Sequence, residues 1–148
     1  MRHLCAGALV ALLCSGASYA QDGPASLIGR FAAEFSAMDP AAIAALFRPD
    51  GTFFGTTQPD LMRGPEGVRG YFTSGFASGG WRKLTCDVLD AREVSATAAT
   101  VNALCRVEGA RGDGTPRSGV MRVSALALRD EGEWRFANLH VSDPPRSP

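Results

Sequence analysis

The segment WRFANLHVSDPP, Trp134 to Pro145, is the strongest indicator of architecture in this sequence when it is taken with the alternating run from Met121 to Leu128. A charged turn at residues 129–133 joins the two, and alternating segments joined by a short polar turn predict a β-hairpin. Successive side chains of a strand point to opposite faces, so every second residue of the last strand shares one face. That face is mixed aromatic and polar, as in a sheet that lines a cavity or an interface: Trp134, Phe136, Asn138, His140 and Ser142.

Helical periodicity precedes the strands. Apolar residues recur at helical spacing from Pro24 to Met38, and Asp39-Pro40 is typical of an N-cap followed by proline in the first turn. From Trp81 onward the period is two, and the glycine-rich stretch 108–119 is expected to be a loop or a distorted strand end. The expected order is helices over 24–38 and 40–47, a short strand over 52–57, a third helix from Gly64, and strands over 82–89, 97–107 and 121–128.

The first twenty residues resemble a secretory signal. Arg2 and His3 precede an apolar run from Leu4 to Leu13, and Ser18-Tyr19-Ala20 offers the small residues that a signal peptidase recognises. The apolar run is too short to span a bilayer. We therefore expect cleavage after Ala20 and a periplasmic or secreted protein, with a retained anchor as the alternative. Residues 21–148 are then one domain.

Charge excludes several classes of partner. The sequence has 15 basic and 15 acidic residues, and loss of Arg2 with the signal leaves 14 − 15 = −1. A neutral chain offers no electrostatic footprint for nucleic acid or for an anionic membrane surface. The mature chain would keep one histidine, His140, so no metal site is expected, and no motif indicates a cofactor.

Two cysteines, Cys86 and Cys105, would remain in the exported chain. A hairpin centred between Ser95 and Ala96 would place them directly opposite each other, at a separation compatible with a disulfide. Oxidising compartments favour such bonds. The alternative is a pair of buried free thiols.

Three segments together resemble the nuclear transport factor 2-like superfamily, which includes ketosteroid isomerase, the SnoaL-like polyketide cyclases and the SgcJ/EcaC group. They are RFAAEFSAMDPAAIAALFRPDGTFFGT at 30–56, GPEGVRGYF at 64–72, and the final W-x-x-x-x-x-H-x-S-x-x-P block. That last block is also similar to the association domain of calcium/calmodulin-dependent protein kinase II. The resemblance implies an α+β cone, in which a curved, mostly antiparallel sheet wraps around N-terminal helices.

The resemblance predicts the fold more specifically than it predicts the function. Aligned with ketosteroid isomerase, this chain has Gly55 at the position of the general base and Phe31 at that of the tyrosine donor. An enolising isomerase needs both groups, and neither glycine nor phenylalanine can replace them. Another chemistry in the same cone stays open.

The kinase association domain offers a better match at two places. Arg106 aligns with an arginine that points into a deep pocket in that family, which implies a clamp for a carboxylate. The alternative is a cross-strand ion pair, because the predicted register makes Asp87 a diagonal neighbour of Arg106, with Thr85 directly opposite.

His140 and Ser142 match the H-x-S element of that domain, which implies a general acid/base or hydrogen-bond donor at the mouth of the pocket. The alternative is a histidine in the core or an interface, bonded to a carbonyl. The remaining pocket wall is expected from four residues that could instead pack helices on the sheet: Tyr71, Trp81, Phe136 and Asn138.

We therefore expect a periplasmic protein that binds a small apolar molecule with a polar or acidic end. A cofactor-independent cyclase, isomerase or hydratase and an oligomeric assembly hub are the alternatives, so whether the protein is an enzyme stays open. A homodimer is expected through an apolar outer face of the sheet, made by Val101, Ala103, Val107, Val123, Ala125 and Ala127.

Overall fold

The computed structural model describes residues 23–145. The predicted signal peptide, residues 1–20, lies outside the described residues. Within the described part of the chain, no helix is long and apolar enough to cross a membrane.

In the described part of the chain, three helices form where helical periodicity predicts them: α1 (Ser26–Ala37), α2 (Pro40–Ala45) and α3 (Gly64–Gly79). One side of α1 is buried, and Phe31 and Phe35 on it anchor the helix in the core. The Asp39 carboxylate accepts hydrogen bonds from the backbone N–H groups of Ala41 and Ala42, each at 2.9 Å. Asp39 is thus the N-cap of α2, as predicted.

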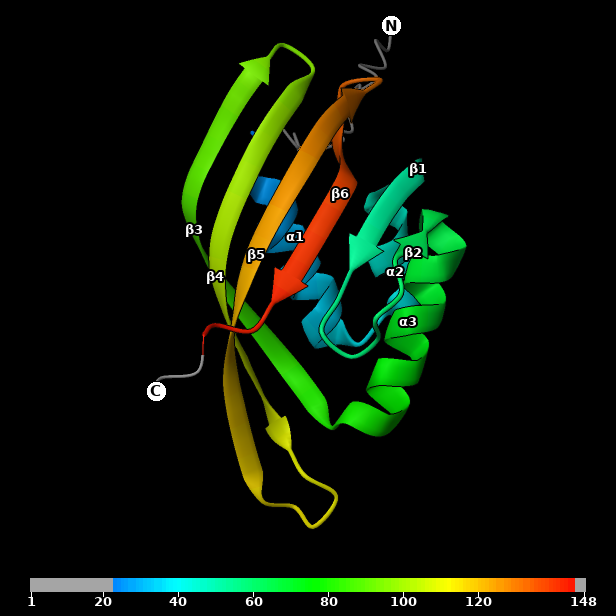
Figure 1. Ribbon diagram of the computed structural model, residues 1–148, viewed down its shortest axis with the longest axis vertical. Coiled ribbons are helices and arrows are strands. Elements are labelled where there is room, and N and C mark those ends of the chain that lie inside the picture. The colour runs from blue at the N-terminus through cyan, green and yellow to red at the C-terminus, as the bar shows by residue number, and fades with distance from the viewer. Residues whose placement is uncertain (1–22, 146–148) are drawn as a thin grey trace, which may run out of the picture.

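Six strands of residues 23–145 form one curved sheet in the order β2-β1-β6-β5-β4-β3 (Figure 1). Within this described sheet only β1 and β6 run parallel, and the other neighbours are antiparallel. The predicted α+β fold with a mostly antiparallel sheet is confirmed. The strands are β1 (Phe47–Phe54), β2 (Met62–Arg63), β3 (Trp81–Ser95), β4 (Ala98–Ala110), β5 (Pro116–Asp130) and β6 (Glu133–Ser142).

The glycine-rich stretch 108–119 is mostly strand. Pairing between β4 and β5 continues as far as Ala110 opposite Pro116, so only residues 111–115 form the turn. Ladder hydrogen bonds use backbone groups, which glycine supplies as well as any other residue. The β4–β5 hairpin therefore projects beyond the rest of the sheet (Figure 1).

A disulfide joins Cys86 to Cys105, and the two are direct cross-strand partners as predicted. Register shifts on the loop side of this pair, between Val88 and Asp90 and between Glu93 and Ser95, leave Ser95 opposite Ala98. The turn is therefore centred one residue later than the predicted point. Local bulges moved the turn and left the cysteine register intact.

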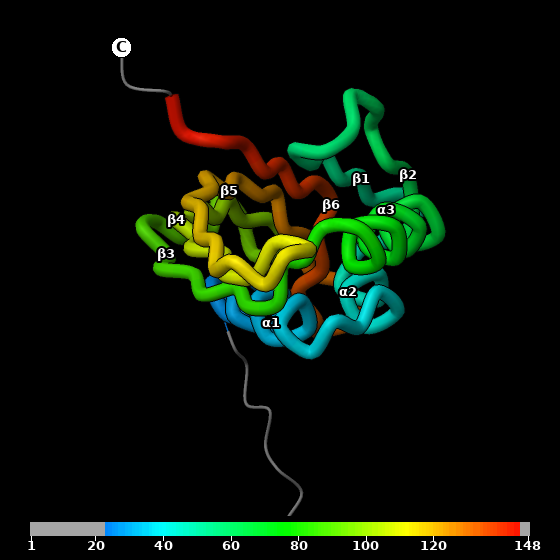
Figure 2. The backbone as a smooth tube through the Cα atoms, turned by 90° about the horizontal axis from the view of Figure 1, so that it is seen from below, coloured from blue at the N-terminus to red at the C-terminus, as the bar shows by residue number. Residues whose placement is uncertain are grey.

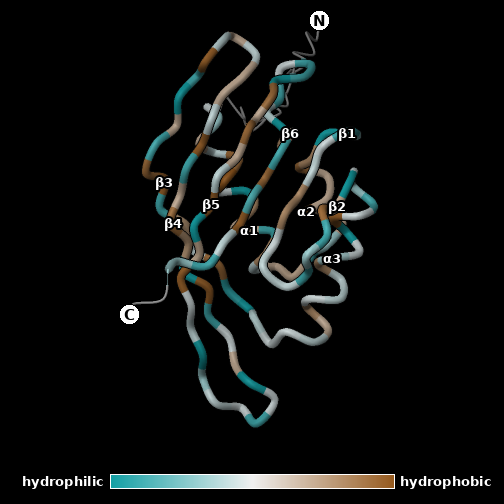
Figure 3. Tube along the Cα trace, viewed as in Figure 1, coloured by the Kyte–Doolittle hydropathy of each residue, from teal (hydrophilic) through white to brown (hydrophobic). Residues whose placement is uncertain are grey.

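The inner face of the sheet is apolar and carries the core. Figure 2 shows α1 and α2 on the same side of β3, β4 and β5, and Figure 3 shows hydrophobic and hydrophilic residues alternating along the strands. A sheet covered on one side places its apolar residues on that side. The outer-face assignment made for the homodimer is therefore wrong, because its six residues are buried against the helices: Val101, Ala103, Val107, Val123, Ala125 and Ala127.

The alternation of β6 is interrupted once. Phe136 pairs with Ala127 whereas Asn138 pairs with Leu126, which leaves Ala137 as the extra residue of a bulge. A one-residue slip moves all later side chains to the opposite face. The inward residues are consequently Trp134 and Phe136 before the bulge, and Leu139 and Val141 after it.

Candidate functional site

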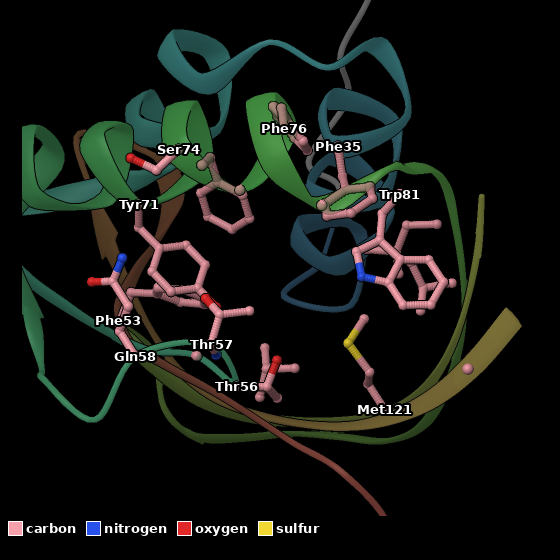
Figure 4. A pocket seen from close by; sticks show the side chains of 18 of the residues that line it. Phe35, Phe53, Thr56, Thr57, Gln58, Tyr71, Ser74, Phe76, Trp81 and Met121 are labelled. Atoms are coloured by element: carbon pink, nitrogen blue, oxygen red, sulfur yellow. The ribbon is translucent and has the colours of Figure 1, made fainter. Parts of the chain in front are cut away.

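A cavity of about 460 Å³ lies between the inner face of the sheet and helices α1 and α3. Its walls are largely aromatic, because α1 and α3 direct side chains of helical spacing toward the curved strands. Figure 4 shows Tyr71 and Trp81 at opposite sides of this space, with Met121 extending from the sheet below Trp81. The aromatic residues of the wall are Phe31, Phe35, Phe53, Tyr71, Phe72, Phe76 and Trp81.

Polar groups gather at the Tyr71 side of the cavity. Thr56, Thr57 and Gln58 follow β1 and line this part of the wall, as Figure 4 shows. The Tyr71 hydroxyl accepts a hydrogen bond from the backbone N–H of Thr57 at 3.2 Å. A phenol that accepts one bond keeps its own proton to donate. Tyr71 can therefore donate to a bound molecule.

Gly55 and Phe31, the positions aligned with the acid-base groups of ketosteroid isomerase, both line the cavity. A Cβ atom at Gly55 would lie 2.3 Å from the Tyr71 hydroxyl oxygen, which is closer than non-bonded atoms approach. Tyr71 thus occupies the space that a side chain at position 55 would need.

The side chain of Arg117 lies at the Trp81 side of the cavity. The Arg117 guanidinium carbon is 3.5 Å from the centroid of the Trp81 ring, well within cation–π range. Both residues pair with Gly109, Trp81 from β3 and Arg117 from β5. Since Gly109 has no side chain, Arg117 and Trp81 can meet across it.

The sequence did not single out Arg117, because it lies in the stretch 108–119 expected to be a loop. The run from Arg111 to Arg117 is rich in glycine and proline, and polar and apolar residues do not alternate along it. The sequence pattern therefore does not indicate a strand there. Only the continuation of the β4–β5 ladder places it beside Trp81.

The ionisable side chains that line the cavity, among the residues described, are Tyr71, Arg117 and Asp143. Asp143 is exposed, and its backbone carbonyl accepts a hydrogen bond from Arg122. Over residues 23–145, no three histidine, cysteine, aspartate or glutamate side chains are grouped to hold a metal ion. The arrangement offers an apolar chamber with a hydroxyl donor at one side and a cation at the other.

Two of the predicted wall residues, Tyr71 and Trp81, do line the cavity. Phe136 instead is fully buried in the core, where its ring packs against Phe31 and Phe47. Phe136 faces inward because it precedes the bulge, but it does not line the cavity.

The prediction that Arg106 points into the cone is wrong. Its neighbours Cys105 and Val107 are buried on the inner face, so alternation places Arg106 on the outer face, where it is exposed. Thr85 lies opposite it, as predicted. The alternative ion pair with Asp87 is also absent from the salt bridges of the described residues.

The pocket positions predicted for His140, Asn138 and Ser142 are wrong for a single reason: all three follow the bulge at Ala137 and lie on the outer face. The His140 ring stacks on Phe54, with centroids 5.5 Å apart. Asn138 donates a hydrogen bond to the Thr52 hydroxyl at 2.9 Å. These residues build the outer surface of β1 and β6.

The family model of the SnoaL-like domain matches residues 25–147, which is nearly all of the chain whose geometry has been described. The chain belongs to the SnoaL-like domain family. The predicted resemblance to the nuclear transport factor 2-like superfamily is thereby confirmed, and solved structures of the same fold support it. No curated protein matches this SnoaL-like chain.

Three solved structures illustrate the likeness. A ketosteroid isomerase-like protein from Erwinia carotovora atroseptica has 18% identity and a TM-score of 0.74, over 82% of this chain and 93% of that one. A putative calcium/calmodulin dependent protein kinase II association domain from Xanthomonas campestris has 19% identity and a TM-score of 0.72, over 83% and 86%. An NTF2-like protein with a cystatin-like fold from Novosphingobium aromaticivorans has 18% identity and a TM-score of 0.65, over 83% and 80%. At these identities the likeness establishes the fold, and function must be argued from the cavity.

Proposed function

We propose that this SnoaL-like domain binds a small molecule, apolar over most of its length and polar or acidic at one end, in the aromatic cavity. The observation that carries the proposal is the cavity itself, about 460 Å³ between the sheet and α1 and α3. Ligand sites in proteins are concave, mostly apolar and roughly 300–1,000 Å³, with a few placed polar groups. The expected location is the periplasm or the outside of the cell.

The chemistry of the wall favours binding over catalysis. Proton abstraction requires a base within reach of the substrate. The described residues place glycine at position 55 and His140 outside the cone, and Asp143, the carboxyl group that lines the cavity, is exposed to solvent. The cavity is open rather than plugged by side chains, which supports ligand binding over a purely structural role as an assembly hub. Ligand binding is therefore the function for which the wall already supplies the necessary groups.

A cavity-filling pair of variants tests the proposal. Gly75 lines the cavity from α3, and Gly70 is on the same helix and exposed; a Cβ atom at either position would contact nothing within 4 Å. Phenylalanine at position 75 should occupy the chamber, whereas phenylalanine at position 70 should extend into solvent. The two variants share composition and helix and differ in the cavity alone.

Fluorescence titration with Nile red, a neutral apolar dye, measures occupancy. We expect saturable binding to the mature protein and to the Gly70→Phe variant, and loss of binding for Gly75→Phe. Absence of saturable binding to the wild-type protein, or equal binding by Gly75→Phe, would contradict the proposed function.

A further inference from the structure

We propose that Arg117, stacked on Trp81, binds the carboxylate of the ligand, so that the ligand class is an organic monocarboxylate with an apolar body. The inference rests on the proposed function, since it assigns an orientation to a molecule in the same cavity. Three observations carry it: the position of Arg117, its lack of a protein partner, and the polarity of the opposite wall.

The position comes from the sheet register. Trp81, Gly109 and Arg117 form one row across β3, β4 and β5. The guanidinium lies over the indole at 3.5 Å, and both residues line the cavity. Stacking on an aromatic face fixes the plane of a guanidinium and leaves the N–H groups at its edge available.

The lack of a partner is the second observation. The Arg117 Nε atom is buried and has no hydrogen-bond partner, and no carboxylate lies within 4.0 Å of Arg117 in the part of the chain that the structure describes. Buried donors in native proteins are nearly always satisfied. The charge of Arg117 therefore has no anionic partner among the described residues, and a ligand that enters the cavity could supply one.

The guanidinium edge selects a carboxylate among anions. Its parallel N–H groups match the two oxygens of a carboxylate, which gives short, charge-assisted hydrogen bonds. Arg117 supplies one positive charge to the cavity wall, which balances the single charge of a monocarboxylate but only half of the charge of a dianion such as a phosphate monoester. The site therefore suits a monoanion.

The third observation is the opposite wall. Tyr71 and Trp81 stand at opposite sides of the cavity (Figure 4), and Tyr71 keeps a hydroxyl proton to donate. A ligand anchored at Arg117 would extend its apolar body along Phe35, Phe76 and Met121 toward Tyr71. A carbonyl or hydroxyl at that far end would be recognised there.

A shape-matched probe pair tests the assignment. 2-Naphthylacetic acid and 2-naphthylacetamide share shape and differ in charge, so calorimetric titration of both isolates the contribution of the carboxylate. For the wild-type protein we expect the acid to bind about 10- to 100-fold more tightly than the amide, the range for hydrogen bonds to a charged group. Arg117→Met should abolish this preference without changing the affinity for the amide.

Two further variants sharpen the result. Arg117→Lys keeps the charge and loses the planar fork, so it should keep only part of the preference. Arg106→Met removes an arginine from the outer face and should leave the preference intact. Circular dichroism of each variant verifies that it is folded.

Failure of the inference is distinguishable from failure of the proposed function. Equal binding of acid and amide, or an equal loss of both in Arg117→Met, would show that Arg117 is only part of the wall. Binding of Nile red with no binding of the acid would also overturn the carboxylate site, and the proposed function would stand. Loss of Nile red binding as well would overturn both.

Discussion

Gly109 is the residue on which the Trp81 side of the cavity depends. A Cβ atom there would lie 2.1 Å from the Gly80 carbonyl oxygen and 2.8 Å from the Trp81 Cα atom. Both are backbone atoms, which cannot rotate away. Glycine is therefore required for close approach of two strands, and the same absence of a side chain lets Arg117 reach Trp81.

We predict that Gly109→Ala lowers the free energy of unfolding by about 1–3 kcal/mol, the usual cost of overpacking. Urea denaturation followed by tryptophan fluorescence measures both the stability and the environment of Trp81. Gly112→Ala is the matched control, because nothing lies within 4 Å of a Cβ atom at that position in the turn. Equal stability of the two variants would contradict the steric argument.

The Cys86–Cys105 disulfide closes a loop with a sequence separation of 19 residues. In the chain-entropy model such a crosslink stabilises the folded state by about 3 kcal/mol, because it restricts the unfolded chain. We predict that the double variant Cys86→Ser, Cys105→Ser loses about this amount in urea denaturation. Reductant should destabilise the wild-type protein similarly and leave the double variant unchanged. Two titratable thiols in denatured, non-reduced protein from the periplasm would refute the bond.

At the scale of elements, Arg48 ties β1 to the turn between β5 and β6. Its guanidinium bonds Asp50 at 3.0 Å and also pairs with Asp130. The hydrogen bond from Arg48 holds the pKa of the Asp50 carboxyl below its usual range. The ion pairs of Arg48 thus lie at the end of the parallel β1–β6 pair where Phe47 is opposite Phe136.

This contact predicts a pH dependence. A carboxyl whose folded pKa is depressed contributes stability above its unfolded pKa of about 3.9, and that contribution is lost as the pH falls through the folded value. We expect Asp50→Asn to unfold at lower temperature than wild type near pH 7, by a small amount because the group is exposed. The difference should vanish in acid below the folded pKa of Asp50, as thermal denaturation across pH 2–7 would reveal. A difference that is constant with pH would contradict this assignment.

The bulge at Ala137 shows how one residue redirects an element. Before it, β6 directs aromatic side chains inward; after it, Leu139 and Val141 take the inner face and His140 moves outward. Without the extra residue His140 would share the face of Phe136. His140, for which alternation predicted a place inside the cone, is in consequence part of the outer surface.

For the whole molecule, the outer face is the surface through which we expect two copies to associate. It presents Leu104 at 40%, Leu126 at 38% and Phe54 at 37% exposure, among polar residues of neighbouring strands. A mixture of apolar anchors and polar groups is typical of protein interfaces. The expectation of a homodimer therefore moves to different residues from those first assigned.

We predict a concentration-dependent dimer in sedimentation velocity, and a monomer for Leu104→Arg, because a charge introduced on this face would have to be desolvated in the interface. Leu61→Arg is the control, since Leu61 has the same 40% exposure but lies outside the sheet. A wild-type protein that stays monomeric at all concentrations would contradict the prediction.

The sequence by itself determined that helices precede most of the strands, the α+β class, the capping of α2 by Asp39 and the pairing of Cys86 with Cys105, but not the short strand β2 or the start of β1 at Phe47. These features depend on local periodicity and on the register of one hairpin, which are properties of short segments. Tyr71 and Trp81 are also predictable as wall residues, because an aromatic residue on a helix face or at the start of a strand is recognised from the local sequence pattern.

Only the tertiary structure decided which face of the sheet is inside. Alternation groups Arg106 with one set of neighbours and Cys105 with the other, but it does not say which set the helices cover. The position of α1 and α2 settles that for β4 and β5, and a single bulge reverses the phase of β6. The pairing of Arg117 with Trp81 joins residues 36 positions apart through the strand between them, a contact that no local pattern encodes.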